Sequence, residues 1–319
     1  MTEEIALASK LPLDEPQDIY NIIDRAILLT IDNWMIILKT SLWPAIACFI
    51  AQVLMQYSLH NLINSNFRVN NIIIFSVVIF ISFLVYFCAY WVWFIRQLAV
   101  AKYLSGFADS IEDSLKFINK TQWDILLYNF ALAILIIIVL IPIFIEFAYL
   151  ANFLKTVNHP AIIATFLLSV FLVFTAFIFT SLSAMIAGSI VIMCENTRLR
   201  QTIKKIYLFI KTQLLNIILI HLFLVIILLP LSIAFYIPSL IVSSFDIGNI
   251  HKVNQIHELI KHQNLFTISI NKVCEIALQF FSYSLINITY GLLYLNFKMK
   301  YLGLDILNKI KGRYEEIVS

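Results

Sequence analysis

Long apolar stretches separated by short polar segments dominate the chain. A helix needs about 20 mostly apolar residues to cross a hydrocarbon layer of ~30 Å. Six stretches meet this requirement: 35–59, 72–95, 124–151, 161–194, 212–243 and 267–296. The pattern predicts an all-α integral membrane protein with six transmembrane helices. We expect the longer fourth and fifth helices to tilt or to extend beyond the bilayer, and Pro230 and Pro238 to kink or end the fifth.

A shorter amphipathic stretch precedes the first, third and fifth predicted spans. In residues 19–34, 107–118 and 199–210, apolar side chains recur every three or four positions, with charged side chains between them. This spacing puts the apolar side chains on one face of a helix that lies at the membrane surface. Lys-Thr-Gln also occurs at both 120–122 and 211–213, which indicates a threefold repeat. We expect three transmembrane hairpins, each preceded by a cytoplasmic interfacial amphipathic helix.

Composition agrees with this pattern, and the distribution of charge predicts how the chain is oriented in the membrane. Hydrophobic residues make up 61% of the 319 residues and charged residues 13%, which excludes an ordinary soluble domain and a disordered chain. Of the 22 Lys and Arg residues, 17 lie in the N-terminal segment (with Lys39 at the start of the first span), the 96–123 and 195–211 connections and the tail. Because positive residues favour the cytoplasmic side, we predict that both termini are cytoplasmic. The chain is then one membrane domain, residues 1–319, with a flexible N-terminus (1–16) and a cytoplasmic tail (298–319).

Two segments resemble a known family. Residues 187–215 read Ala-Gly-Ser-Ile-Val-Ile-Met-Cys-Glu-Asn-Thr-Arg-Leu-Arg-Gln-Thr-Ile-Lys-Lys-Ile-Tyr-Leu-Phe-Ile-Lys-Thr-Gln-Leu-Leu, and residues 293–305 read Leu-Tyr-Leu-Asn-Phe-Lys-Met-Lys-Tyr-Leu-Gly-Leu-Asp. These resemble the bacterial six-span inner-membrane proteins of the YciC type and the membrane domain of some glycerophosphodiester phosphodiesterases. Asn296 departs from the acidic residue common at that position. The resemblance implies an inner-membrane fold but no activity, since the catalytic barrel needs roughly 250 residues and only about 23 follow the last predicted span.

The best candidate for a functional site is a polar stripe in the sixth predicted span. Its residues recur every fourth position: Asn271, Glu275, Gln279, Tyr283 and Asn287. Four-residue steps keep them along one side of a helix, which must face the bundle or a watery groove. The stripe predicts either a polar cleft for a headgroup, an ion or a small solute, or hydrogen bonding between helices. His221 in the fifth span either joins this cleft, pairs with Glu275 or Glu146, or is satisfied by a neighbouring helix.

The sequence shows no recognisable catalytic, cofactor-binding or metal-binding motif. The sequence contains no Walker A, G-x-G-x-x-G or G-x-S-x-G run, and no two of the four cysteines form a C-x-x-C pair. His257 and His262 are five positions apart, whereas the two histidines of a zinc-binding helix are four apart. We therefore expect a protein that is not an enzyme and holds no cofactor or metal, with an intramembrane enzyme using Glu275 or His221 left open.

Two surface features predict how the protein meets the membrane. The basic residues before the fifth span should attract anionic lipid headgroups: Arg198, Arg200, Lys204, Lys205 and Lys211. Aromatic residues predicted at one membrane interface are Trp34, Tyr90, Trp91, Trp93 and Trp123. A net charge of +3 does not suggest nucleic-acid binding. The expected partners are membrane lipids, with a membrane protein complex or a homo-oligomer as further partners. The alternative function is a transporter or channel along the polar stripe.

Overall fold

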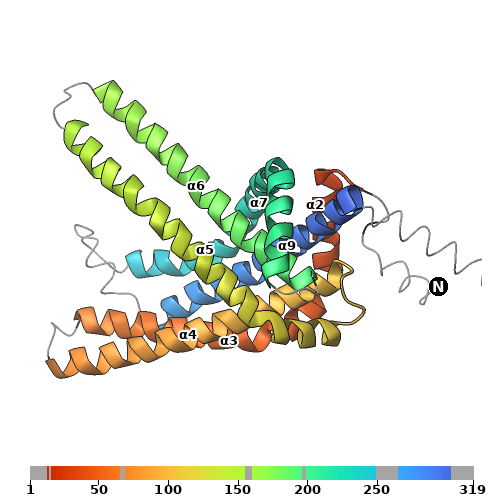
Figure 1. The fold of residues 1–319 in the computed structure, drawn as a ribbon. Coiled ribbons are helices and arrows are strands. Elements are labelled where there is room, and N and C mark those ends of the chain that lie inside the picture. The colour runs from red at the N-terminus through yellow and green to blue at the C-terminus, as the bar shows by residue number, and fades with distance from the viewer. Residues whose placement is uncertain are drawn as a thin grey trace, which may run out of the picture. The chain divides into compact units, whose positions relative to one another are not determined.

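The computed structural model describes residue 13 and residues 16–64, 69–154, 160–195, 199–248 and 265–302. This part of the chain is helical and contains no strand: α2 (Ile19–Asp32), α3 (Trp34–Asn64), α4 (Val69–Leu104), α5 (Ile111–Leu154), α6 (Pro160–Cys194), α7 (Leu199–Gly248) and α9 (Leu265–Leu302). Figure 1 shows these helices along the chain. Each of the six predicted spans falls within one of the six helices from α3 to α9. The all-α class is therefore confirmed.

In the part of the chain that the structure describes, five helices are long and apolar enough to cross a membrane. The stretches that meet this condition are Trp34–Leu62, Ile72–Leu104, Ile111–Pro142, Thr202–Val242 and Leu265–Tyr301. In α6, the apolar stretch found among the described residues is shorter and runs from Thr180 to Cys194. The chain is accordingly a membrane protein with several spanning helices.

Capping hydrogen bonds and a glycine mark where several helices begin or end. The Asp18 side chain accepts a hydrogen bond from the backbone N–H of Asn21 at the start of α2. At the start of α5, the Ser110 hydroxyl accepts from the Asp113 N–H and donates to its carboxylate. Between α4 and α5, Gly106 takes a φ of +77°, a left-handed conformation that glycine adopts without steric cost after a helix end.

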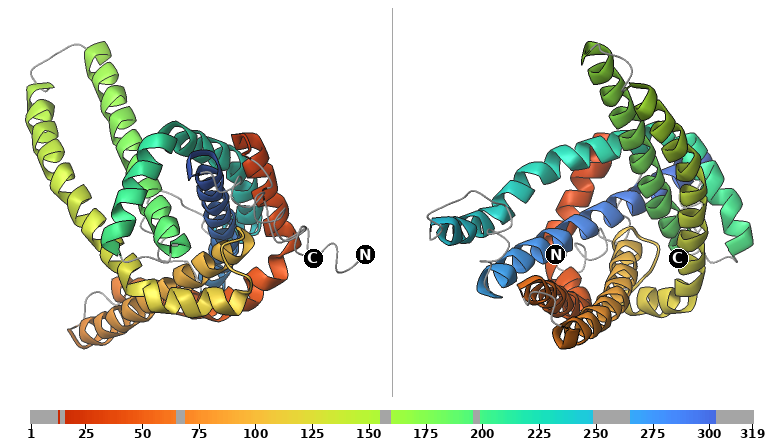
Figure 2. Two further views of the ribbon diagram at one scale, coloured as in Figure 1. Left: turned by 45° about the vertical axis from the view of Figure 1, so that its right-hand side comes forward. Right: turned by 90° about the vertical axis from the view of Figure 1, so that its left-hand side faces the viewer.

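The amphipathic stretches take two forms. The first is a separate helix, α2, which ends at Asp32 before α3 begins at Trp34. The second and third are the first turns of α5 and α7, which continue into the apolar part without a break. Figure 2 shows that the beginning of α5 runs at an angle to the rest of that helix. α7 also continues past Pro230 and Pro238 to Gly248, so neither proline ends it.

The helices form two compact units that alternate along the chain. Unit 1 contains residues 1–23, 105–222 and 290–319, and unit 2 contains residues 24–104 and 223–289. α3 packs against α4 within unit 2, and α5 packs against α6 within unit 1. α7 and α9 each contribute one part to each unit. The units are therefore not consecutive domains, because three helices, α2, α7 and α9, pass from one to the other.

The core of unit 2 contains a residue predicted at the membrane interface. Trp93 is 1% exposed and packs with Ala45 and Cys48 of α3 and with Phe280 of α9. Trp34 and Trp123 are 56% and 71% exposed, as interfacial residues require. The Trp93 ring serves helix packing, because its position in α4 faces the neighbouring helices α3 and α9. Its depth in the membrane stays a prediction.

Candidate functional site: polar clusters on α9

The polar face of α9 lies in unit 2, and most of its members have hydrogen-bond partners within the protein. Asn271 accepts a hydrogen bond from the Ser239 hydroxyl of α7 at 2.5 Å. Glu275 pairs with Lys272 at 2.5 Å and accepts a hydrogen bond from the Gln279 amide at 3.2 Å. Among the described residues, the hydrogen bonds and the ion pair of Glu275 are thus made on its own helix, about one turn away in each direction.

Tyr283 and Asn287 continue this face toward the C-terminal end of the helix. The Tyr90 hydroxyl of α4 donates to the Tyr283 hydroxyl at 3.2 Å, and the two rings meet edge to face. Asn287 is buried, with 3% of its surface exposed. One turn before Asn287, the Tyr283 ring also contacts the Trp93 ring, with centroids 5.8 Å apart.

A polar chain that the sequence did not reveal runs beside this face. The Gln97 amide of α4 donates to the Ser41 hydroxyl of α3 at 3.0 Å and accepts from the Ser284 hydroxyl of α9 at 2.7 Å. All three residues are buried. One glutamine therefore links three helices, which is the role of interhelical hydrogen bonds within a membrane. Gln97 and Ser41 are 56 residues apart, so no local spacing could have paired them.

Among the residues of unit 2 that the structure describes, three polar side-chain atoms are buried without a hydrogen-bond partner. They are the Gln52 Oε1 of α3, the Trp93 Nε1 of α4 and the Gln279 Oε1 of α9. Buried polar atoms in native proteins almost always have partners, so each such atom requires an explanation, such as a water molecule or a ligand. These three atoms are the specific observation in favour of a polar solute within unit 2.

His221 belongs to unit 1 and bonds to residues outside the polar stripe. Its Nδ1 lies 2.7 Å from the Tyr290 hydroxyl of α9 and 3.1 Å from the Ser183 hydroxyl of α6. Both hydroxyls lie next to the same ring nitrogen. If His221 were to act as a base for Ser183, Tyr290 would compete with Ser183 for that nitrogen. This geometry suits a histidine that ties α6, α7 and α9 together better than one that activates a serine. The side chain of Glu146 lies outside the described residues.

A cluster of opposite charges surrounds Glu195 in unit 1, and we call it the Glu195 cluster. Glu195 follows the last residue of α6 and is 5% exposed. It accepts a hydrogen bond from the Tyr294 hydroxyl of α9 at 2.6 Å and pairs with Lys205 of α7 and, at 3.2 Å, with Lys298 of α9. The Lys298 ammonium also lies 5.5 Å from the centre of the Phe107 ring.

The charge state of Glu195 follows from these contacts. Burial by itself raises the pKa of the Glu195 carboxyl group. The hydrogen bonds from Lys205 and Tyr294 and the charge of Lys298 lower this pKa by a larger amount, so it lies below its usual value of 4.5. Glu195 is therefore ionised at neutral pH. Two lysines close to one carboxylate leave this cluster with a net positive charge.

Sequence reasoning missed Glu195, although a signal was present. An acid directly after the C-terminus of a helix is unfavourable, because the helix dipole places partial negative charge there. Such a residue requires compensating cations, and the two segments that carry the family resemblance supply them. Lys205 lies in 187–215, as Glu195 does, and Lys298 and Tyr294 lie in 293–305. The two segments thus meet in space.

The basic segment of α7 presents two faces. Its buried face contains Thr202, Ile206 and Phe209, and the Phe209 ring meets the Tyr294 ring edge to face at 5.2 Å. Its exposed residues include Ile203, Lys204, Tyr207, Leu208 and Lys211. Ile203, predicted on the apolar face of this segment, is 51% exposed. Arg198 and the side chain of Arg200 lie outside the described residues.

Comparison with known proteins adds no functional information. No protein-family model, curated protein or solved structure matches this chain significantly. Among the described residues, no three His, Cys, Asp or Glu side chains are grouped as metal ligands would be. The function is therefore inferred from the arrangement of the chain's own residues.

Proposed function

We propose that this protein is a non-enzymatic protein of the bacterial inner membrane that engages anionic lipids through the beginning of α7. In this proposal the chain crosses the membrane six times as three hairpins, with both termini in the cytoplasm and the basic segment at the cytoplasmic surface. The protein would act in envelope organisation or as an accessory subunit of a membrane complex or homo-oligomer. The resemblance to six-span inner-membrane proteins supports the same view.

One observation carries this proposal: the exposed face of α7 combines cations with apolar side chains. Lys204 and Lys211 are seven positions apart and lie on the same side of the helix, with Tyr207 between them at 66% exposure. The Lys211 ammonium lies 5.9 Å from the centre of the Tyr207 ring. Basic residues attract phosphate headgroups, and an exposed tyrosine inserts at the same depth of the bilayer.

The Glu195 cluster supports the proposal by fixing this face. Lys205 is held by Glu195, and Phe209 packs against Tyr294 and Phe297 of α9. The buried face of the segment is thus tied to α9 by an ion pair and by aromatic contacts. The exposed lysines therefore lie on a helix that is already held in place, so lipid binding does not require this segment to fold first.

The test compares two double variants with the same loss of charge. Lys204→Gln with Lys211→Gln removes the exposed cations of α7, and Lys116→Gln with Lys120→Gln removes two exposed cations of α5. The measurement is the ratio of phosphatidylglycerol to phosphatidylethanolamine that stays bound after purification in mild detergent. At about 1 kcal/mol for each lysine, we expect the α7 variant to lower the affinity for phosphatidylglycerol by about tenfold or more. An equal effect of both variants, or no effect of the α7 variant, would overturn the proposal.

A transporter or channel along the polar face of α9 is the second candidate. The buried Oε1 atoms of Gln52 and Gln279, which lack partners, favour it. Its test replaces Glu275 and Asn287 by leucine and measures solute flux into vesicles together with thermal stability. Lost flux with normal folding would support a pathway, whereas unchanged function with equal or higher stability would remove it.

A further inference from the structure

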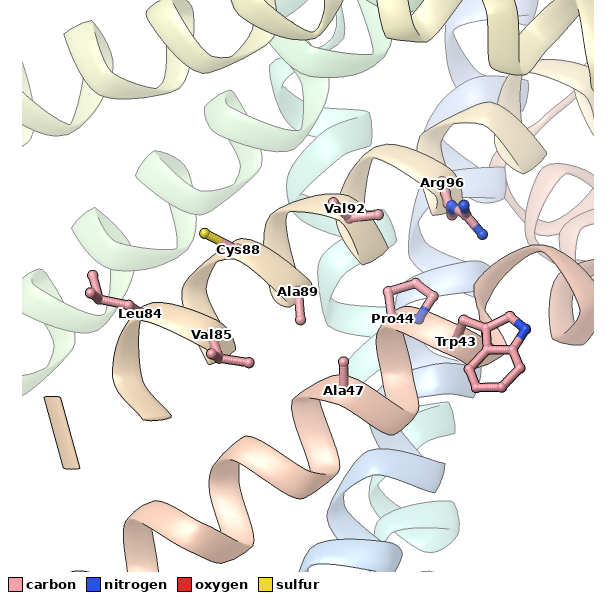
Figure 3. Close-up of a pocket in the computed structure, with 9 residues that line it drawn as sticks. All are labelled: Trp43, Pro44, Ala47, Leu84, Val85, Cys88, Ala89, Val92 and Arg96. Atoms are coloured by element: carbon pink, nitrogen blue, oxygen red, sulfur yellow. The ribbon is translucent and has the colours of Figure 1, made fainter. Parts of the chain in front are cut away.

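An apolar groove with a single cation at one end runs between α3 and α4 in unit 2. It has a volume of about 540 Å³, within the range typical of ligand sites. Figure 3 shows Leu84 at one end and Trp43 and Arg96 at the other. Arg96 is the one charged residue among the side chains that line it.

The groove exists because small residues face each other where the two helices pass. Ala47 of α3 lies opposite Ala89 of α4, and Cys88 of α4 also lines this groove. Leu84 and Arg96 lie on the same side of α4, three steps of four residues apart, so the groove follows the helix axis for about three turns. An open, elongated, apolar groove of this kind can accommodate a hydrocarbon chain.

The position of Arg96 is fixed by a proline on the other helix. Pro44 lies within α3 and has no N–H, so the carbonyl of Thr40, four residues earlier, loses its partner in the helix. The Arg96 Nη1 donates to this carbonyl at 2.8 Å. A guanidinium has five N–H donors, and this is the one hydrogen bond that Arg96 makes within the described part of the chain. The remaining donors are available to an acceptor at the end of the groove.

The groove opens toward the surroundings of the protein. Trp43 at its end is 74% exposed, and Leu84, Val85 and Val92 along its length are 46%, 47% and 44% exposed. Because α3 and α4 are long and apolar enough to span a membrane, the medium around these side chains is lipid. An exposed tryptophan beside an arginine is typical of the level where acyl chains end and headgroups begin.

We infer that this groove is a phospholipid site. One acyl chain lies along Ala47, Cys88 and Ala89, and the phosphodiester accepts hydrogen bonds from Arg96 beside Trp43. Charge complementarity favours this occupant, because a single cation at the end of an apolar groove matches an anionic group at the end of a hydrocarbon chain. The site does not depend on the basic segment of α7, so each proposal can fail without the other.

The test is native mass spectrometry of the full chain in mild detergent, with lipids added back after delipidation. The two probes are phosphatidylglycerol and a diacylglycerol with the same acyl chains but no phosphate. Cys88→Phe fills the groove, and Ile81→Phe places the same ring at an exposed position of α4 that does not line it. Arg96→Gln removes the cation. Arg96→Lys is the second variant, for the case that Arg96→Gln impairs folding through loss of the Thr40 contact, because lysine keeps the positive charge.

In the Lys204→Gln/Lys211→Gln background, which removes the exposed cations of α7, we expect one phosphatidylglycerol to bind with the groove unchanged and with Ile81→Phe, and its affinity to fall at least tenfold with Cys88→Phe. Arg96→Gln should weaken binding by about tenfold, the effect of one charge-assisted hydrogen bond, and Arg96→Lys by less. Diacylglycerol should bind at least tenfold more weakly than phosphatidylglycerol. Equal binding of both lipids, or equal loss in Cys88→Phe and Ile81→Phe, would overturn the site. The α7 double variant should leave this lipid in place.

Discussion

Unit 1 and unit 2 each contain a buried polar cluster on α9, but the two clusters have different chemistry. In unit 1, Lys298 and Tyr294 hold a buried carboxylate, Glu195, together with a second lysine. In unit 2, Ser284 belongs to a neutral chain through Gln97. The same helix thus takes part in an ionic network near one end and in an uncharged network along its length.

The difference follows from the cost of charge in a membrane. An ionised side chain at the bilayer centre costs about 2.5–3.5 kcal/mol on insertion scales, and this cost falls toward the interface. Glu195 and Lys298 lie next to the ends of α6 and α9, where that cost is smallest. A neutral interhelical hydrogen bond within a membrane contributes only about 0.6 kcal/mol. We therefore expect unit 1 to be far more sensitive to single polar substitutions than unit 2.

The largest effect is expected for Glu195→Ala. The substitution leaves Lys205, Lys298 and the Tyr294 hydroxyl without their shared acceptor. Breaking a buried ion pair costs about 3–5 kcal/mol, and we expect about 2–3 kcal/mol here because the Lys205 side chain is 40% exposed. The measurement is the free energy of unfolding in a denaturant titration in mixed micelles. The control is Lys116→Gln, which removes an exposed pair with Asp113 and should cost no more than about 0.5 kcal/mol. Equal losses in both variants would contradict the assigned role of the cluster.

The same carboxylate makes the stability of unit 1 depend on pH. Because the pKa of folded Glu195 lies below its usual value of 4.5, its contribution is fully present above pH 4.5 and is lost as the pH falls through the folded pKa. Thermal unfolding of the wild type should therefore shift to lower temperature in acid by more than that of Glu195→Gln. Parallel pH profiles for the two proteins would show that another group is responsible.

A smaller effect is expected at Gly188 of α6. A methyl group at this position would collide with the Tyr128 ring of α5, whose hydroxyl donates to the Ala184 carbonyl at 2.9 Å. Gly188→Ala should cost about 1–2 kcal/mol, the usual range for an overpacked site. In a double-mutant cycle, Tyr128→Leu should reduce that cost by removing the clash. Independent, additive effects of the two substitutions would contradict this packing.

The smallest effect is expected for Gln279→Leu in unit 2. Its Oε1 is buried without a partner and its amide makes a long hydrogen bond of 3.2 Å to Glu275. Removing an unsatisfied polar atom offsets the loss of that bond, so the free energy of unfolding should change by less than about 0.5 kcal/mol. A loss above 1 kcal/mol would mean that Gln279 has a partner, such as a bound water or solute, and would strengthen the transport alternative.

Sequence patterns predicted the helices because hydrophobicity acts locally. Each of the six apolar stretches lies within one helix, since a run of about 20 apolar residues carries its own signal. Helix breaks were harder to predict. Asn33 separates α2 from α3, whereas the amphipathic beginnings of α5 and α7 continue into the spans. Amphipathicity alone does not state whether a helix ends.

The polar contacts could not be predicted in the same way. The stripe on α9 was visible because its members share one helix face, but their partners Ser239 and Tyr90 are remote in sequence. The partners of Glu195 on α9 are about 100 residues away from it. Trp93 was assigned to the interface because its type is common there, and its burial depends on α3 and α9. Such pairings are properties of the packed bundle.

Pro44 has a consequence that reaches beyond its own helix. Its missing N–H leaves the Thr40 carbonyl to Arg96 of α4, so a main-chain atom serves as the docking point of a charged side chain. Any other residue at position 44 would restore the N–H and offer that carbonyl a partner within α3. The charge of α4 would then lose its anchor although no charged residue had changed. A neutral-to-neutral substitution on one helix would thus act as an electrostatic mutation on another.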